Sequence, residues 1–286
     1  MYVTAKTIRT TIQATIPMKI KDKFTELKTR NEGALIAYIC AGDPAPEATA
    51  EIVHALVRGG ADIIELGLPF SDPIADGPTI QASIERALDA GMNPDIFFDL
   101  VRSLDADVAA DVPLVVMTYY NLIFKRGLER FVTDCVDSGI SGIIVPDLPV
   151  EESDDLAAQC KKHGVDLIFL IAPTTYPERM KKIAERGSGF IYLVARTGVT
   201  GARVDVADST ITLIESVRST TRTSTPLAVG FGISTGDQAS TMIKAGADGA
   251  IVGSAFVNII ADGRDVPERV EQLTQELKAG CCRNRD

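Results

Sequence analysis

The sequence lacks the features of membrane-spanning, secreted and nucleic-acid-binding proteins. No apolar run approaches the roughly 18 uninterrupted residues of a membrane-spanning helix. Residues 1–17 are rich in Thr with scattered charges and have no apolar segment like that of a secretory signal. Lys and Arg number 29 against 39 Asp and Glu, a net charge of −10, whereas binding to a nucleic acid requires a basic surface. We therefore expect a cytoplasmic protein with no membrane and no nucleic-acid partner.

Cysteine is also sparse. The chain has 5 cysteines, an odd number without the CxxC spacing of metal sites: Cys40, Cys135, Cys160, Cys281 and Cys282. The last two are adjacent in a polar stretch, where they cannot easily bridge each other. We expect reduced thiols, as in a reducing compartment.

A repeated pattern organises the chain. A glycine followed by small or acidic residues precedes apolar runs rich in Val, Ile and Leu. Glycine closes a helix in the left-handed conformation, and a short loop then leads into a strand. Apolar runs with little alternation are typical of parallel strands covered on both faces. With three further runs, the pattern predicts eight strands, at 34–40, 63–67, 113–119, 143–147, 167–172, 190–195, 226–231 and 250–253.

Eight strands that alternate with amphipathic stretches over about 250 residues predict an α/β fold, a single-domain (β/α)8 TIM barrel at residues 19–280. A doubly wound sheet is the alternative, but residues 40–44 (CAGDP) cannot form the GxGxxG turn usual after its first strand. Residues 19–30 are expected to form a helix that closes the bottom of the barrel, and a short helix should follow strand eight. We expect residues 1–18 to be a disordered extension and residues 281–286 a polar tail.

Two carboxylates are candidate catalytic groups, because such barrels take these groups from the C-terminal ends of strands. Alternation puts Ala61, Ile63 and Glu65 on one side of the second strand, so that the carboxylate points into the barrel mouth. Burial would raise its pKa towards values useful in acid/base chemistry, and a buried ion pair is the alternative. The long loop 68–78 supplies Asp76, whose alternative role is to cap the next helix.

Two glycine motifs predict a phosphate site. Residues 230–234 (GFGIS) follow strand seven, and Gly253 and Ser254 open the helix after strand eight. In this fold, phosphate binds between these loops at backbone N–H groups and a helix N-terminus. Neither motif is basic, which indicates dipolar binding; plain turns and a Ser254 helix cap are the alternative. Residues 198–201 (GVTG) have the glycines of a mobile lid.

Several reaction types lack the residues that they need. The histidines, His54 and His163, fall in helices away from the expected mouth, so a zinc aldolase lacks its ligands and a His-dependent hydrolase its base. No expected strand ends in Lys, so a Schiff-base aldolase or a pyridoxal enzyme lacks its nucleophile. Two carboxylates and a phosphate site predict acid/base chemistry with no metal and no cofactor in this chain.

Five segments resemble the alpha subunit of tryptophan synthase: IELGLPFSDPIADGPTIQ, IIVPDLPVEES, FIYLVARTGVTGA, VGFGIST and AIVGSAFV. The resemblance runs in order from about Lys19 to about Gly280, and the first of these segments is its most specific part. It implies a lyase of tryptophan biosynthesis that cleaves indole-3-glycerol phosphate to indole and glyceraldehyde 3-phosphate, a retro-aldol reaction.

The resemblance also implies roles for residues. Glu65 is the acid/base group, and Asp76 faces the indole nitrogen. The other matches are substrate-binding positions. Tyr38 and Ile144 form the indole wall, Tyr192 lies beside the catalytic Glu, and Thr200 is the lid residue. The phosphate site matches at Gly201, Gly232, Gly253 and Ser254, and Phe231 is a further substrate-binding position. Core packing is the alternative role for Ile144.

The family works with a beta subunit that holds pyridoxal phosphate and receives indole through a tunnel in an alpha2-beta2 complex. By this resemblance, Asp72 and Pro73 are partner-interface residues. Two positions depart from the family pattern: Tyr38 stands where Phe is common, and Ala195 where a small hydroxyl residue is frequent. The first adds a hydroxyl to the indole wall, and neither removes the expected chemistry.

Three alternatives stay open on the sequence alone. One is a sugar-phosphate isomerase or epimerase, but these use a metal or paired Asp with His, which this chain lacks. Another is a catalytically silent allosteric subunit that only binds the phosphate ligand, which the loss of Glu65 or Asp76 would mark; both are present. The third is a stand-alone lyase that releases free indole.

Overall fold

The computed structural model describes residues 17–104, 108, 111–195, 206–230 and 232–283. Some expectations therefore concern residues outside the described ones: residues 1–16, the lid at 198–201 with Thr200 and Gly201, and Phe231.

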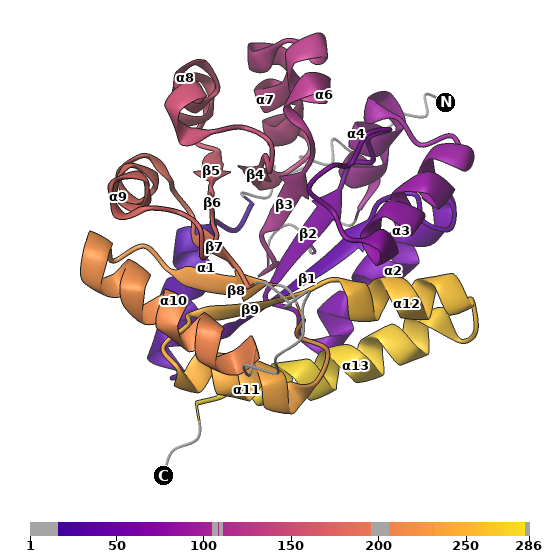
Figure 1. Cartoon of the computed structure of the whole chain (residues 1–286). Coiled ribbons are helices and arrows are strands. Elements are labelled where there is room, and N and C mark those ends of the chain that lie inside the picture. Colours follow the sequence, from indigo (N-terminus) through magenta and orange to yellow (C-terminus); the bar gives the residue numbers. More distant parts are fainter. Residues whose placement is uncertain (1–16, 105–107, 109–110, 196–205, 231, 284–286) are drawn as a thin grey trace, which may run out of the picture.

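The described strands form one parallel barrel, with neighbours in the order β5-β4-β3-β2-β1-β9-β8-β7-β6 (Figure 1). Their bounds are β1 Ala34–Cys40, β2 Ile63–Gly67, β3 Leu114–Met117, β4 Ile140–Ile144, β5 Asp166–Ile168, β6 Leu170–Ile171, β7 Ile191–Val194, β8 Leu227–Gly230 and β9 Gly249–Val252. β5 and β6 are two parts of one expected strand. The interruption is at Phe169, whose carbonyl accepts a hydrogen bond from the Tyr192 N–H at 3.0 Å. The eight strands and the TIM barrel are thus confirmed, but β4 lies at Ile140–Ile144 and not at the expected 143–147.

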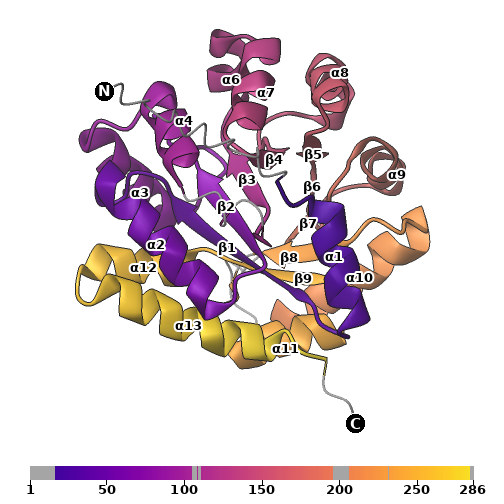
Figure 2. The same ribbon diagram turned by 180° about the vertical axis from the view of Figure 1, so that it is seen from behind.

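Helices surround the strands on the outside (Figures 1 and 2). Several begin with a proline in the first turn, where its missing N–H costs nothing, and Gly60 and Gly164 end two of them in the left-handed conformation. The helices are α1 Ile20–Thr29, α2 Pro46–Gly59, α3 Pro78–Asp89, α4 Pro94–Ser103, α6 Tyr120–Arg126, α7 Leu128–Asp137, α8 Asp154–His163, α9 Pro177–Arg186, α10 Val206–Thr221, α11 Gly236–Lys244, α12 Ser254–Asp262 and α13 Val266–Gly280, with a 3-10 turn η1 at Val150–Glu152.

The core has two layers. One lies between strands and helices. The other fills the barrel with inward residues of the strands, among them Ile36, Ile63, Val115, Ile144, Ile168, Tyr192, Ala228 and Ile251, and the partly buried Leu170 of β6 packs against them. Glu65, two residues after Ile63, therefore points inward as predicted. The expectation for Ala61 was wrong, because β2 begins only at Ile63 and Ala61 packs in the outer layer.

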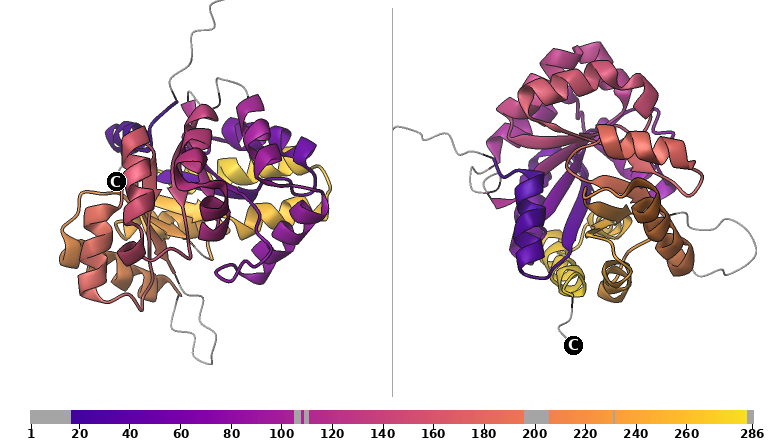
Figure 3. Two further views of the ribbon diagram at one scale, coloured as in Figure 1. Left: turned by 90° about the horizontal axis from the view of Figure 1, so that it is seen from above. Right: turned by 90° about the vertical axis from the view of Figure 1, so that its left-hand side faces the viewer.

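The end of the barrel opposite the site is closed by α1, as predicted (Figures 2 and 3). Ile20, Phe24 and Leu27 join the inner layer, and the Phe24 ring lies 6.1 Å from that of Phe190. The expected polar tail differs at its first residue. Cys281 is fully buried, and its carbonyl accepts a hydrogen bond from the Gly33 N–H at 2.8 Å.

Candidate active site

A cavity of about 570 Å³ opens where the barrel strands end. Its walls include the sequence-predicted site residues that the structure describes, apart from the interface pair: Tyr38, Glu65, Asp76, Ile144, Tyr192, Gly232, Gly253 and Ser254. They come from β1, β2, β4 and β7 and from the loops after β2, β8 and β9. The fold thus brings together side chains that are far apart in the sequence.

Glu65 projects from β2 into this cavity and is only 1% exposed. Its Oε2 atom has no hydrogen-bond partner among the described residues, and no cation among those residues contributes to its electrostatic environment. Burial, and secondarily the charge of Asp76, raise the pKa of Glu65 from 4.5 to about 8. The buried ion pair is therefore not supported, and at neutral pH the carboxyl group is mainly protonated.

Asp76 faces the same cavity from the loop between β2 and α3. Its Oδ2 accepts a hydrogen bond from the Tyr119 hydroxyl at 2.6 Å. Burial raises the pKa of Asp76, and this hydrogen bond opposes the rise. The capping role is contradicted, because the N-cap of α3 is Gly77 and no side chain caps that helix.

Two buried tyrosines, Tyr38 on β1 and Tyr192 on β7, line the cavity. Tyr38 on β1 is in register with Glu65 on β2, and burial raises the pKa of both Tyr38 and Tyr192 well above the usual value. Their hydroxyls require glycine on neighbouring strands. A Cβ atom at Gly67 would lie 2.4 Å from the Tyr38 hydroxyl, and one at Gly230 would lie 2.4 Å from that of Tyr192. Both phenols stay neutral at ordinary pH.

The expected phosphate site is a helix N-terminus. Helix α12 starts at Ser254 with Gly253 as its N-cap and no side-chain cap, so Ser254 is not the plain cap of the alternative. The first N–H groups of a helix have no acceptor within it, and the helix dipole favours an anion there. Among the described residues, no Lys or Arg lines the cavity. This arrangement suits dipolar binding of a phosphate.

Several cavity residues were missed from the sequence. Asn258 lies one turn after Ser254 on α12, and the i, i+4 spacing was the available signal. Thr79 and Ile80 line the cavity from the first turn of α3. Tyr119, which follows β3, contacts Asp76 and does not itself line the cavity.

The loop after β2 also reaches the surface. Asp72 is exposed, Pro73 is half-buried and Ile74 is 83% exposed, and together they border a second, shallower hollow beside α3. Another large apolar side chain, Phe124 on α6, is 67% exposed. Loops after the strands of a barrel lie at its C-terminal face, so Asp72, Pro73 and Ile74 lie on the same face as the cavity.

Neither a membrane span nor a metal cluster occurs in the described part of the chain. No helix there has both the length and the apolar character to cross a bilayer. Within the same residues, no three His, Cys, Asp or Glu side chains are grouped as metal ligands.

Comparisons with known proteins agree on one family. The sequence model of the family described as "Tryptophan synthase alpha chain" matches residues 24–284. The tryptophan synthase alpha chain of Methanosarcina barkeri is 60% identical over 262 residues, which cover 92% of this chain and 97% of that protein. A structure of tryptophan synthase from Mycobacterium tuberculosis matches with a TM-score of 0.83 and 36% identity, over 94% of this chain and 100% of the other. The tryptophan synthase complex of Pyrococcus furiosus gives 0.77 and 36%, over 86% and 98%.

Proposed function

Because the chain belongs to the tryptophan synthase alpha chain family, we propose that this cavity carries out the family's reaction, the cleavage of indole-3-glycerol phosphate to indole and glyceraldehyde 3-phosphate. The enzyme is a carbon–carbon lyase. A sugar-phosphate isomerase or epimerase belongs to other families, so that alternative is set aside.

The observation that carries the proposal is the state of Glu65. It is a buried carboxyl group without a hydrogen-bond partner for Oε2 among the described residues, in a cavity that it shares with a second carboxylate. Its raised pKa gives it a proton to donate at neutral pH. A carboxyl group with these properties is suited to an acid/base role. It would not serve a purely structural role, because burying a polar group without a hydrogen bond lowers the stability of the fold.

The reaction follows from these groups. Glu65 donates its proton to indole C3, and the ring nitrogen becomes positively charged. The Glu65 carboxylate then takes the proton from the hydroxyl on the adjoining side-chain carbon. The electron pair of that O–H bond forms the aldehyde C=O, the carbon–carbon bond breaks, and its electron pair neutralises the ring. Glu65 ends protonated, ready for another cycle.

Asp76 supports the charged intermediate, because a carboxylate facing the ring N–H stabilises positive charge on the nitrogen. The other end of the substrate is held by its phosphate at Gly232, Gly253 and Ser254. Tyr38, Ile144 and Tyr192 form the walls between the two ends. Thr200, Gly201 and Phe231 complete this proposed set from outside the described residues.

The partner is the beta subunit of tryptophan synthase, which holds pyridoxal phosphate, while alpha chains carry no cofactor of their own. We assign Asp72 and Pro73, with the neighbouring exposed Ile74, to the interface with it. A cytoplasmic location suits this biosynthetic role.

The direct test is indole release from indole-3-glycerol phosphate by the purified chain, measured alone and with added beta subunit. We expect indole in both cases, with glyceraldehyde 3-phosphate in equal amount. If the chain binds the substrate but releases no indole, both alone and with the beta subunit, the silent phosphate-binding subunit is favoured instead.

A further inference from the structure

Asp76 is held in place by two side chains outside the cavity wall. The Tyr119 hydroxyl donates to Asp76 Oδ2 at 2.6 Å and accepts a hydrogen bond from the Ala75 N–H at 3.0 Å. Gln81 Nε2 donates to the Asp76 carbonyl at 2.8 Å and to the Pro73 carbonyl at 3.3 Å. The first residue fixes the carboxylate and the second fixes the backbone that carries it.

Tyr119 has little freedom of its own. It is 3% exposed, and its ring lies 5.3 Å from that of Phe70. It is also the N-cap residue of the short helix α6, so its backbone moves only if α6 moves.

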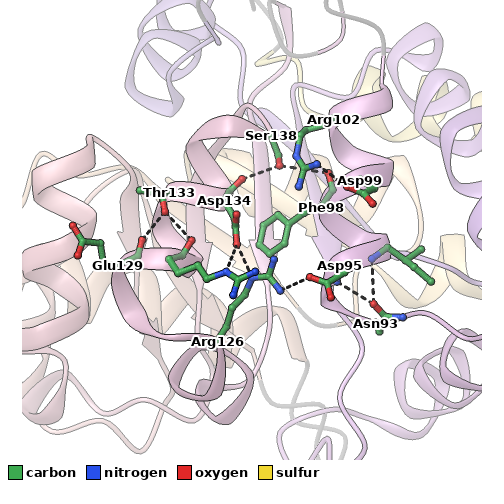
Figure 4. A network of polar contacts seen from close by, with 12 residues as sticks. Asn93, Asp95, Phe98, Asp99, Arg102, Arg126, Glu129, Thr133, Asp134 and Ser138 are labelled. Atoms are coloured by element: carbon green, nitrogen blue, oxygen red, sulfur yellow. Dashed lines mark hydrogen bonds and ion pairs between the residues drawn. The ribbon is translucent and has the colours of Figure 1, made fainter.

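Helix α6 is fixed at its other end by Arg126 (Figure 4). The guanidinium donates to Asp95 on α4 at 2.8 Å and to Asp134 on α7 at 2.6 Å, and it lies 4.9 Å from the centre of the Phe98 ring. This network ties α6 to both neighbouring helices. The Tyr119 hydroxyl is thus presented to Asp76 from a rigid support.

On the basis of the function proposed above, we propose that Tyr119 is a positioning residue of the reaction: it binds one oxygen of Asp76 and leaves the other for the ring N–H of the substrate. Since Tyr119 does not line the cavity, it acts through Asp76. Gln81, which is exposed, supports the same geometry from α3.

The hydrogen bond also acts on the charge of Asp76. In the part of the chain that the structure describes, the titratable groups that interact with this carboxylate are Glu65, Tyr38, Tyr192 and Cys40, none of them a cation, in addition to Tyr119. Burial raises the pKa of Asp76, and the Tyr119 hydrogen bond is the opposing influence. Tyr119 therefore keeps Asp76 ionised to lower pH than burial alone would allow.

Tyr119→Phe tests the inference, with Tyr120→Phe as the matched control. The control removes the same hydroxyl from the next residue, where it makes no hydrogen bond within the described residues. We expect Tyr119→Phe to lower kcat for indole release by about 10- to 100-fold, the range for one hydrogen bond to a charged group. KM should change less than about threefold, because the phosphate end is untouched. The acidic limb of the pH profile of kcat should shift to higher pH, and the control should match the parent chain.

Measurements in an Asp76→Asn chain distinguish the proposed role of Asp76 in the reaction from the proposed role of Tyr119 in positioning it. If Tyr119 acts through Asp76, adding Tyr119→Phe to Asp76→Asn should cause little further loss. An Asp76→Asn chain with full activity would contradict the role of Asp76 itself. An inactive Asp76→Asn chain beside a fully active Tyr119→Phe chain would overturn only the inference on Tyr119.

Gln81→Met provides a second route that does not touch the buried tyrosine. Met has a similar length and lacks the donor, and the position is exposed, so the fold should be retained. We expect a smaller fall in kcat, about 3- to 10-fold, again with little change in KM. Unchanged kcat in Tyr119→Phe, measured on a chain with parental thermal unfolding, would contradict the inference on Tyr119, and unchanged kcat in Gln81→Met would contradict the supporting role of Gln81.

Discussion

Glu65 and Asp76 face one cavity but are treated differently by their surroundings. Glu65 Oε2 has no hydrogen-bond partner among the described residues, whereas Asp76 accepts a hydrogen bond from Tyr119. Burial raises the pKa of both, to about 8 for Glu65. Two carboxylates with such unequal environments can take unequal roles, one as a proton donor and the other as a fixed negative charge.

The pH dependence of activity tests this difference at the residue scale. Glu65 must be protonated to act first, and with a pKa of about 8 it loses that proton as pH rises. We expect kcat/KM to be highest below about pH 8 and to fall tenfold per unit above it, since kcat/KM reports groups of the free enzyme. A value of kcat/KM that instead increases through pH 8 would mean that the carboxylate starts the reaction.

Single residues also show where inference from the sequence ends. Glu65 could be predicted because strand alternation fixes its direction. The contact between Tyr119 and Asp76 could not, because it joins residues 43 positions apart across two loops. The helix-cap alternatives for Asp76 and Ser254 were wrong for a related reason, since Gly77 and Gly253 occupy the N-cap positions.

At the scale of elements, apolar runs and the glycines before them sufficed to predict the barrel. The break in the fifth strand at Phe169 left no mark in the apolar run 167–172, because the pattern records burial and not hydrogen bonding. The first residue of the expected polar tail 281–286 was also misjudged, since polar neighbours concealed the burial of Cys281.

The N-terminus of helix α12 is the proposed binding site for the substrate phosphate. A Cβ atom at Gly253 would lie 3.1 Å from Tyr38 Cδ1, already tight, and Gly253→Asp adds a negative charge at the anion site. We expect KM for indole-3-glycerol phosphate to rise at least about tenfold while the circular dichroism spectrum stays that of a folded barrel. An unchanged KM would place the phosphate elsewhere.

At the scale of the whole molecule, we propose that residues 19–280 form the catalytic domain and that residues 1–18 are an extension to it. Residues 1–17 lack apolar periodicity. Met18, the last residue of the extension, differs from the expected disorder because its carbonyl accepts a hydrogen bond from the Ser141 hydroxyl of the barrel at 2.8 Å. Deletion of residues 1–17 should leave Tm and indole release nearly unchanged. A Tm lower by several degrees would show that the segment packs on the barrel.

The burial of Glu65 makes the stability of the folded protein depend on pH. Its pKa is about 8 when folded against 4.5 as the ordinary value, so between these pH values mainly the unfolded chain releases the proton. The contribution of the group to stability is therefore complete below pH 4.5 and is lost as pH rises through 8. Glu65→Gln, which does not titrate, should be as stable as the parent chain or more stable at pH 7.

Glu65→Gln tests whether Glu65 transfers the protons of the reaction. We expect at least about a 10²-fold loss of indole release, with retained binding of glycerol 3-phosphate and a retained Tm. Glu185→Gln, the same change at an exposed position of α9, should behave like the parent chain. A Glu65→Gln chain that is destabilised by about 3–5 kcal/mol yet still releases indole at the parental rate would rule out a proton-transfer role for Glu65, because that is the behaviour of a structural ion pair.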